Sequence, residues 1–130
     1  MSKNESFYRF PVGFLWGSCV CDYQAFGGTE CDLPLRWTAR HIDHYVEDFE
    51  LISKRMNHNA FRTSIEWARL EPKEGKINRE AIKFYHEYFK ALRKTGVKTF
   101  VTLHHFTNPK WVHDHGGWLS KEIVKKFSGY

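Results

Sequence analysis

Cysteine is scarce in this chain, which limits the frameworks that could hold it together. The 130 residues include three cysteines, Cys19, Cys21 and Cys31, and no C-x-x-C pair. An odd count without that spacing argues against a disulfide framework and against a zinc ribbon. We therefore expect small buried thiols. One alternative stays open, a metal site that joins these cysteines to some of the eight histidines.

Long apolar runs and clustered positive charge are also missing. No run of 18 apolar residues occurs, and residues 1–9 are polar, which indicates neither a membrane span nor a signal peptide. The net charge of +5 comes from lysines and arginines scattered along the chain, so we expect no nucleic-acid partner. The expectation is a cytoplasmic protein without membrane contact.

The chain does contain three apolar, strand-like runs that each lead to polar or aromatic groups. Because parallel strands bring their carboxyl ends to one edge, these groups predict a shared site. Aromatic rings can stack on pyranose faces, and amide, imidazole and guanidinium groups can bind hydroxyls, so a sugar is the favoured ligand. The runs and their end groups are residues 14–20 with Tyr23-Gln24, residues 59–65 with Glu66-Trp67, and residues 98–103 with His104-His105-Phe106.

Helices are predicted between and after these runs. The first spans residues 41–55 and ends near Asn57, which suits a left-handed position. The second begins after Asn78, a good N-cap residue, and ends at Gly96. Ser120 is expected to cap a last helix.

Alternating strands and helices predict an α/β fold with a parallel sheet, and the length predicts one domain over residues 1–130. Three parallel strands neither close a barrel nor form a sheet covered on both faces. The chain is also about half the roughly 250 residues of an eight-stranded α/β barrel. The pattern is therefore that of an incomplete barrel.

Several motifs together resemble the start of glycoside hydrolase family 1, the retaining β-glycosidases. They span nearly the whole chain, in order and at the spacing typical of that family. The resemblance implies that this chain is the first three βα units of a (β/α)8 barrel, and it implies no cofactor and no metal. The motifs are Phe10-Pro11-x-x-Phe14-Leu15-Trp16-Gly17, Tyr23-Gln24, Asp43-His44-Tyr45, Asn59-Ala60-Phe61-Arg62-x-Ser64-Ile65-Glu66-Trp67-x-Arg69-x-x-Pro72, Val101-Thr102-Leu103-His104-His105-Phe106-Thr107-x-Pro109-x-Trp111 and Gly116-Gly117-Trp118.

The resemblance also implies roles for three residues. Gln24 matches a glutamine that hydrogen-bonds the hydroxyls of the sugar, and His105 matches a histidine that binds a sugar hydroxyl. Arg62 matches an arginine that supports the nucleophilic carboxylate. These roles agree with the chemistry, because an amide and an imidazole both donate and accept, and a guanidinium keeps a nearby carboxylate ionised.

Both catalytic carboxylates of the resembled family are missing from these residues. Retaining hydrolysis needs an acid/base and a nucleophile roughly 5 Å apart. The family places them in Asn-Glu-Pro and Glu-Asn-Gly motifs after the fourth and seventh strands, and neither motif occurs here. Glu66 sits at a strand end but matches neither residue. We therefore expect a glycosidase by family, acting on β-glycosides, and an inactive chain when it is alone.

Other features leave alternatives open. Phe26 stands where the family usually has Glu, which bears on the local shape of the sugar site. The chain could instead be a non-catalytic remnant, or half of a split barrel, that binds carbohydrate through Gln24, His105 and Trp111 or binds a complementary chain. Self-association through exposed sheet edges is a further expectation. It would involve the apolar side chains of Phe14, Leu15, Ile65, Phe100 and Val101.

Overall fold

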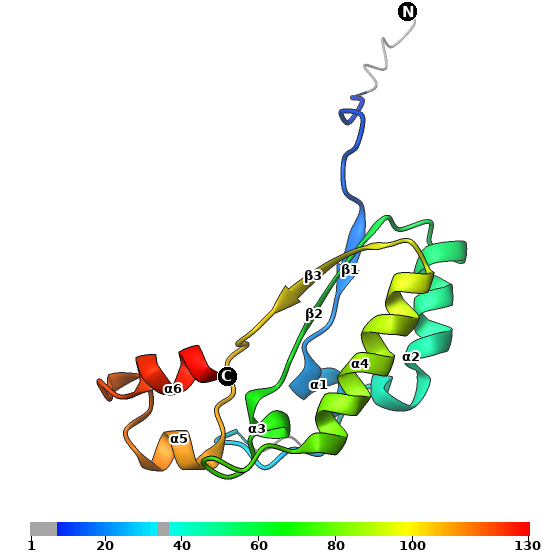
Figure 1. Cartoon of the computed structure of the whole chain (residues 1–130). Helices are drawn as coiled ribbons and strands as arrows, with labels where there is room; N and C mark the ends of the chain where they lie inside the picture. Colours follow the sequence, from blue (N-terminus) through cyan, green and yellow to red (C-terminus); the bar gives the residue numbers. More distant parts are fainter. Residues whose placement is uncertain (1–7, 34–36) are drawn as a thin grey trace, which may run out of the picture.

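The computed structural model describes residues 8–33 and 37–130 and shows a parallel three-stranded sheet flanked by helices. The strands β1 (Gly17–Cys19), β2 (Ala60–Ser64) and β3 (Lys98–Thr102) lie in the order β1-β2-β3. All three run downward in Figure 1, so their carboxyl ends meet at the lower edge of the sheet. The predicted α/β arrangement is confirmed.

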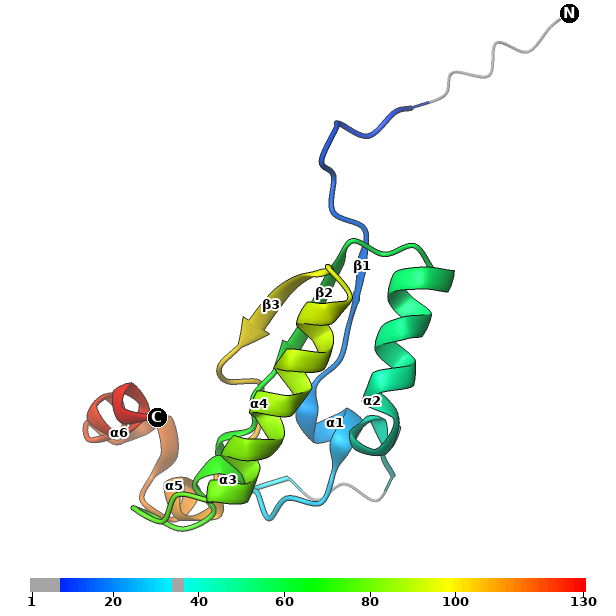
Figure 2. The ribbon, with the colours of Figure 1, turned by 45° about the vertical axis from the view of Figure 1, so that its right-hand side comes forward.

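Two long helical segments cover one face of the sheet (Figures 1 and 2). They are α2 (His41–Glu50), which continues into the π-helical turn η1 (Leu51–Arg55), and α4 (Arg79–Lys94). The remaining helical segments are short. They are α1 (Asp22–Phe26) directly after β1, α3 (Trp67–Leu70) after β2, and α5 (Lys110–Asp114), η2 (Gly117–Leu119) and α6 (Ile123–Gly129) after β3.

Most predicted helix boundaries are correct. Asn57 has φ +53° and Gly96 has φ +73°, so both occupy left-handed positions where the helices end. Asn78 caps α4, and its side-chain oxygen accepts from two amides of the first turn. The prediction for Ser120 is wrong, because α6 begins at Ile123 and its N-cap is Glu122.

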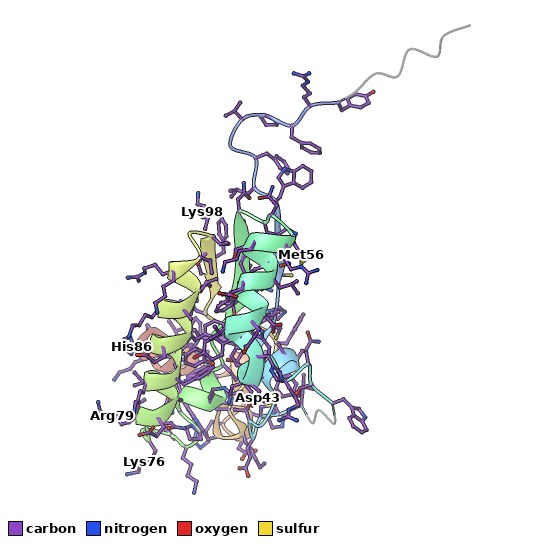
Figure 3. The ribbon with its side chains drawn as sticks, turned by 90° about the vertical axis from the view of Figure 1, so that its right-hand side faces the viewer. Asp43, Met56, Lys76, Arg79, His86 and Lys98 are labelled. Carbon is purple, nitrogen blue, oxygen red and sulfur yellow. The ribbon has the colours of Figure 1, made fainter. Side chains whose placement is uncertain are left out.

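The main core lies between the sheet and the two long helices. Figure 3 looks onto this helical layer, with Met56 and Lys98 at one end and Asp43 and Arg79 at the other. The core is strongly aromatic, which agrees with the 17% aromatic content. Its buried members are Ala25, Phe26, Phe49, Ile52, Phe61, Tyr85, Tyr88, Leu92 and Val97.

The opposite face of the sheet has no helix over it among the described residues (Figures 1 and 2). Side chains alternate across a strand, so Phe61 and Thr63 face the helices while Arg62 lies on the open face. In β3 the exposed residues include Phe100, which pairs with Arg62 in the register. In a closed barrel this open face would be the interior.

Two sequence-based expectations need correction at β1. The strand covers three residues, Gly17–Cys19, rather than residues 14–20. The Asn59 side chain bonds the Trp16 amide (2.7 Å) and the Phe14 carbonyl (2.9 Å), so these backbone groups do not pair with a neighbouring strand. Of the cysteines, Cys21 is buried as expected, but Cys19 is exposed. Cys19 lies on an edge strand, where the described chain puts no neighbour beside it.

Candidate functional site

The three residues predicted to bind sugar or support catalysis all belong to the strands or to the segments that follow them. Gln24 lies on α1, just beyond the carboxyl end of β1, and its side chain is exposed. Arg62 is in the middle of β2, and His105 follows β3 by three residues. Gln24 and His105 therefore lie beyond the same edge of the sheet, with Arg62 deeper. In the described part of the chain, no hydrogen bond or ion pair joins Gln24 to the other two.

The positive charge of Arg62 acts on the His105 imidazole. The Arg62 Nε donates to Thr102 Oγ1 at 2.7 Å, which fixes the guanidinium on the open face of the sheet. Partial burial and, second, the positive charge of Arg62 lower the pKa of His105. A lowered pKa favours the neutral imidazole, which has one donor and one acceptor nitrogen. The His105 Nδ1 is buried without a partner among the described residues.

Glu66 is the most unusual ionisable group at this edge. Its side chain is 3% exposed, and burial, with a smaller contribution from the nearby Asp22, raises its pKa to about 7. The Thr107 hydroxyl donates to Glu66 Oε2 at 2.7 Å, while Oε1 has no partner among the described residues. Glu66 is thus buried just beyond the end of β2 and bonded to the segment that follows β3.

A buried ion pair supports the segment that carries Gln24. Asp22 is fully buried, and its Oδ1 accepts from Arg69 Nη2 at 3.0 Å. The same guanidinium nitrogen donates to the Gly27 carbonyl at 2.6 Å, and the Tyr85 hydroxyl also donates to Asp22. Burial nevertheless raises the pKa of Asp22. These bonds attach both ends of α1 to α3 and α4.

A second polar cluster joins the loop after β1 to the loop after β3. The backbone amide and the side-chain amide of Asn108 donate to the two carboxylate oxygens of Asp32, at 2.9 and 2.7 Å. The Trp118 indole N–H donates to Asn108 Oδ1 at 2.9 Å. Sequence reasoning missed Asp32 and Asn108, because no local pattern marks a pairing across 76 residues. These bonds hold together loops that border the site.

The structure also places the two aromatic residues that bear on the sugar site. Phe26 is buried in the main core, with its ring 5.4 Å from Tyr88 and the Arg69 guanidinium over its face. Its side chain therefore belongs to the core. Trp111, a stacking candidate, packs edge-on against Trp67 at 5.5 Å and donates its indole N–H to the Glu71 carbonyl. That indole serves the packing of α5.

Residues 8–33 and 37–130 contain no group of three or more His, Cys, Asp or Glu side chains that could hold a metal ion. The same residues contain no helix long and apolar enough to cross a membrane. The three predicted residues present an exposed amide, an imidazole whose pKa is lowered and a guanidinium.

Comparison with known proteins decides the family. The family description "Glycosyl hydrolase family 1" matches residues 37–130. This chain belongs to that family. Two curated relatives illustrate the similarity. The 6-phospho-beta-glucosidase GmuD of Bacillus subtilis is 34% identical to this chain across 95% of its residues. The beta-glucosidase 11 of Arabidopsis thaliana is 36% identical across 99%.

Solved structures of this family agree with the fold. The beta-glycosidase from Pyrococcus horikoshii superposes with a TM-score of 0.82 over 90% of the chain, at 36% identity. The AHE enzyme from Alicyclobacillus herbarius superposes with a TM-score of 0.85 over 97%, at 29% identity. The chain spans only about a third of the length of these proteins. The share is 31% for GmuD, 28% for beta-glucosidase 11, 30% for the Pyrococcus horikoshii structure and 33% for the Alicyclobacillus herbarius structure. Its three strands therefore correspond to the first three βα units of the (β/α)8 barrel.

Proposed function

We propose that this chain forms part of the sugar-binding side of a β-glycosidase. In this proposal Gln24 and His105 bind hydroxyls of the sugar, and Arg62 supports a nucleophilic carboxylate that lies outside these 130 residues. The complete enzyme would hydrolyse β-glycosides with retention, and no cofactor or metal takes part. A cytoplasmic location is part of the proposal, and it is supported by three free cysteines.

The observation that supports the proposal is that the three residues belong to the strands of one parallel sheet or to the segments just beyond their carboxyl ends. Gln24 and His105 follow the carboxyl ends of the two outer strands, β1 and β3, and Arg62 lies within the central strand β2 on the open face. A lowered pKa keeps His105 neutral, so its ring can both donate to and accept from a sugar hydroxyl. Relatives with this region include 6-phospho-beta-glucosidase, 6-phospho-beta-galactosidase and beta-glucosidase enzymes, so the proposed substrate is a β-glucoside, a β-galactoside or one of their 6-phosphates.

The catalytic part of the proposal is tested by assaying the purified 130-residue chain on aryl β-glucoside, β-galactoside and the corresponding 6-phosphates. We expect no turnover, because both carboxylates of the retaining mechanism are missing. Turnover that copurifies with the chain and disappears in His105→Ala, but persists in the control His86→Ala, would overturn the proposal. His86 is an exposed histidine in the middle of α4, labelled in Figure 3, and belongs to none of the segments that follow the strands.

The second candidate is a non-catalytic half-barrel that binds a complementary chain. The observation in its favour is the open face of the sheet, where Phe100 is 44% exposed on the edge strand β3. The encoding DNA beyond Tyr130 separates the two candidates. A frame that continues through an Asn-Glu-Pro motif supports the enzyme, and a stop codon supports the half-barrel.

A further inference from the structure

The turn between His105 and Thr107 has an unusual backbone. Phe106 has φ +68°, although it is neither glycine nor asparagine. The Thr107 amide donates to the His105 carbonyl at 2.9 Å, closing a three-residue ring. The positive φ and this bond together are those of a classic γ-turn, which is rare and strained. Such a backbone persists only where the surrounding structure holds it.

A side-chain bond from the neighbouring strand holds this turn. Thr107 is 2% exposed, and its hydroxyl donates to Glu66 Oε2 at 2.7 Å. Glu66 is itself fixed, because its backbone amide donates to the Tyr85 hydroxyl at 3.0 Å. Tyr85 is buried in the main core on α4. A continuous path of bonds therefore runs from the core helix through the end of β2 to the turn after β3.

We propose that Glu66 is a positioning residue that acts through the Thr107 hydroxyl to hold the strained turn and thereby orient the His105 imidazole. The structural role of Glu66 does not depend on the proposed function. Only the purpose of the orientation, presenting the His105 ring to a sugar hydroxyl, rests on that function. Glu66 does not touch the sugar in this arrangement. Its carboxylate is buried and bonded to Thr107, two residues after His105.

The protonation state of Glu66 sets the strength of the bond. An ionised carboxylate accepts a shorter and stronger hydrogen bond than a neutral carboxyl group. Because burial raises the pKa of Glu66 to about 7, the bond to Thr107 should strengthen as the pH rises through that value. The other ionisable groups facing Glu66 are Asp22 and Tyr23 from α1, Arg69 from α3, Tyr85 from α4 and Tyr130 after α6.

The experiment uses NMR on the 130-residue chain, without any sugar. Thr107→Val keeps the shape of the side chain and removes the hydroxyl, whereas Thr107→Ser keeps the hydroxyl. We expect the Thr107 amide to exchange about tenfold faster in Thr107→Val and near the original rate in Thr107→Ser. The three-bond coupling of Phe106 and the side-chain couplings of His105 should change only in Thr107→Val. Exchange of the Phe61 amide in β2 reports whether the fold is intact.

A pH series completes the test. The Phe106 and Thr107 amide shifts should titrate with a midpoint near pH 7, and this titration should be absent in Glu66→Gln. Unchanged exchange and unchanged His105 couplings in a folded Thr107→Val chain would overturn the proposal. A separate titration with methyl β-glucoside tests the function: if the sugar does not perturb His105, the proposed function fails, while the exchange data still decide whether Glu66 positions the turn.

Discussion

At the scale of single residues, Glu66 shows that a carboxylate in a family motif can have a structural role that the sequence does not indicate. In sequence it looks like a catalytic carboxylate, because it follows a strand and precedes an aromatic ring. The structure buries it, bonded to Thr107 and close to Asp22. Its environment, rather than its position along the strand, determines what its carboxyl group can do.

The raised pKa of Glu66 predicts how stability depends on pH. Its pKa rises from 4.5 in the unfolded chain to about 7 in the folded protein, so the folded state binds this proton more tightly. The stabilising contribution is complete below about pH 4.5 and is lost as the pH rises through 7. The free energy of unfolding should fall over that window by on the order of 3 kcal/mol relative to Glu66→Gln.

Urea unfolding of both chains at several pH values measures this difference. The glutamine side chain has the same shape and no titration, so other groups cancel in the comparison. Parallel pH profiles for the two chains would contradict the prediction.

At the scale of elements, the helices follow their local signals closely. Asn78 is the clearest case, since its side-chain oxygen accepts from the amides of Glu80 (3.1 Å) and Ala81 (3.2 Å) at the start of α4. The polar cap begins a helix whose apolar side, including Ala81 and Tyr85, packs on the sheet. The strand β1 is shorter than its apolar run predicts, because the side-chain amide of Asn59 bonds the backbone groups that precede it.

The cap predicts a measurable loss of stability. Asn78→Ala leaves two amides of α4 without their partner and should lower the free energy of unfolding by about 1 kcal/mol. Asn78→Ser keeps a side-chain oxygen that can accept from these amides, so this variant should retain most of the free energy of unfolding. Equal stabilities of the two variants in urea unfolding would show that the cap bonds contribute nothing.

At the scale of the whole molecule, the sheet is open where the family barrel closes. Both β1 and β3 are edge strands of the described sheet, and their outer backbone groups have no strand partner there. Four of the five apolar side chains expected to be uncovered are exposed, namely Phe14, Leu15, Phe100 and Val101. The fifth, Ile65, is half-buried against the main core.

These open edges predict self-association of the isolated chain. Full burial of one such side chain is worth about 1.5–3 kcal/mol, so pairing of two chains would be favourable. Size-exclusion chromatography with light scattering should show a mass that increases with concentration. The double variant Phe100→Lys/Val101→Lys should shift the chain toward monomer, because charges on an edge strand oppose pairing. A sharp, concentration-independent monomer with cooperative thermal unfolding would contradict the prediction.

The sequence by itself determined the features that depend on neighbours along the chain. The apolar periodicity predicts the long helices, Asn57, Asn78 and Gly96 mark their ends, and the ordered motifs identify the family. Each of these is a local property, so backbone preferences and capping bonds suffice to predict it.

Only the tertiary structure decided the features that depend on residues far apart in the chain. The bonds of Thr107 to Glu66, of Arg69 to Asp22 and of Asn108 to Asp32 cross 41, 47 and 76 residues. No sequence pattern marks these residues as partners, because their contact depends on how the strands come together in the sheet. The pKa of Glu66 and the strained turn that carries His105 follow from those contacts, and so does the way the predicted sugar-binding residues are held.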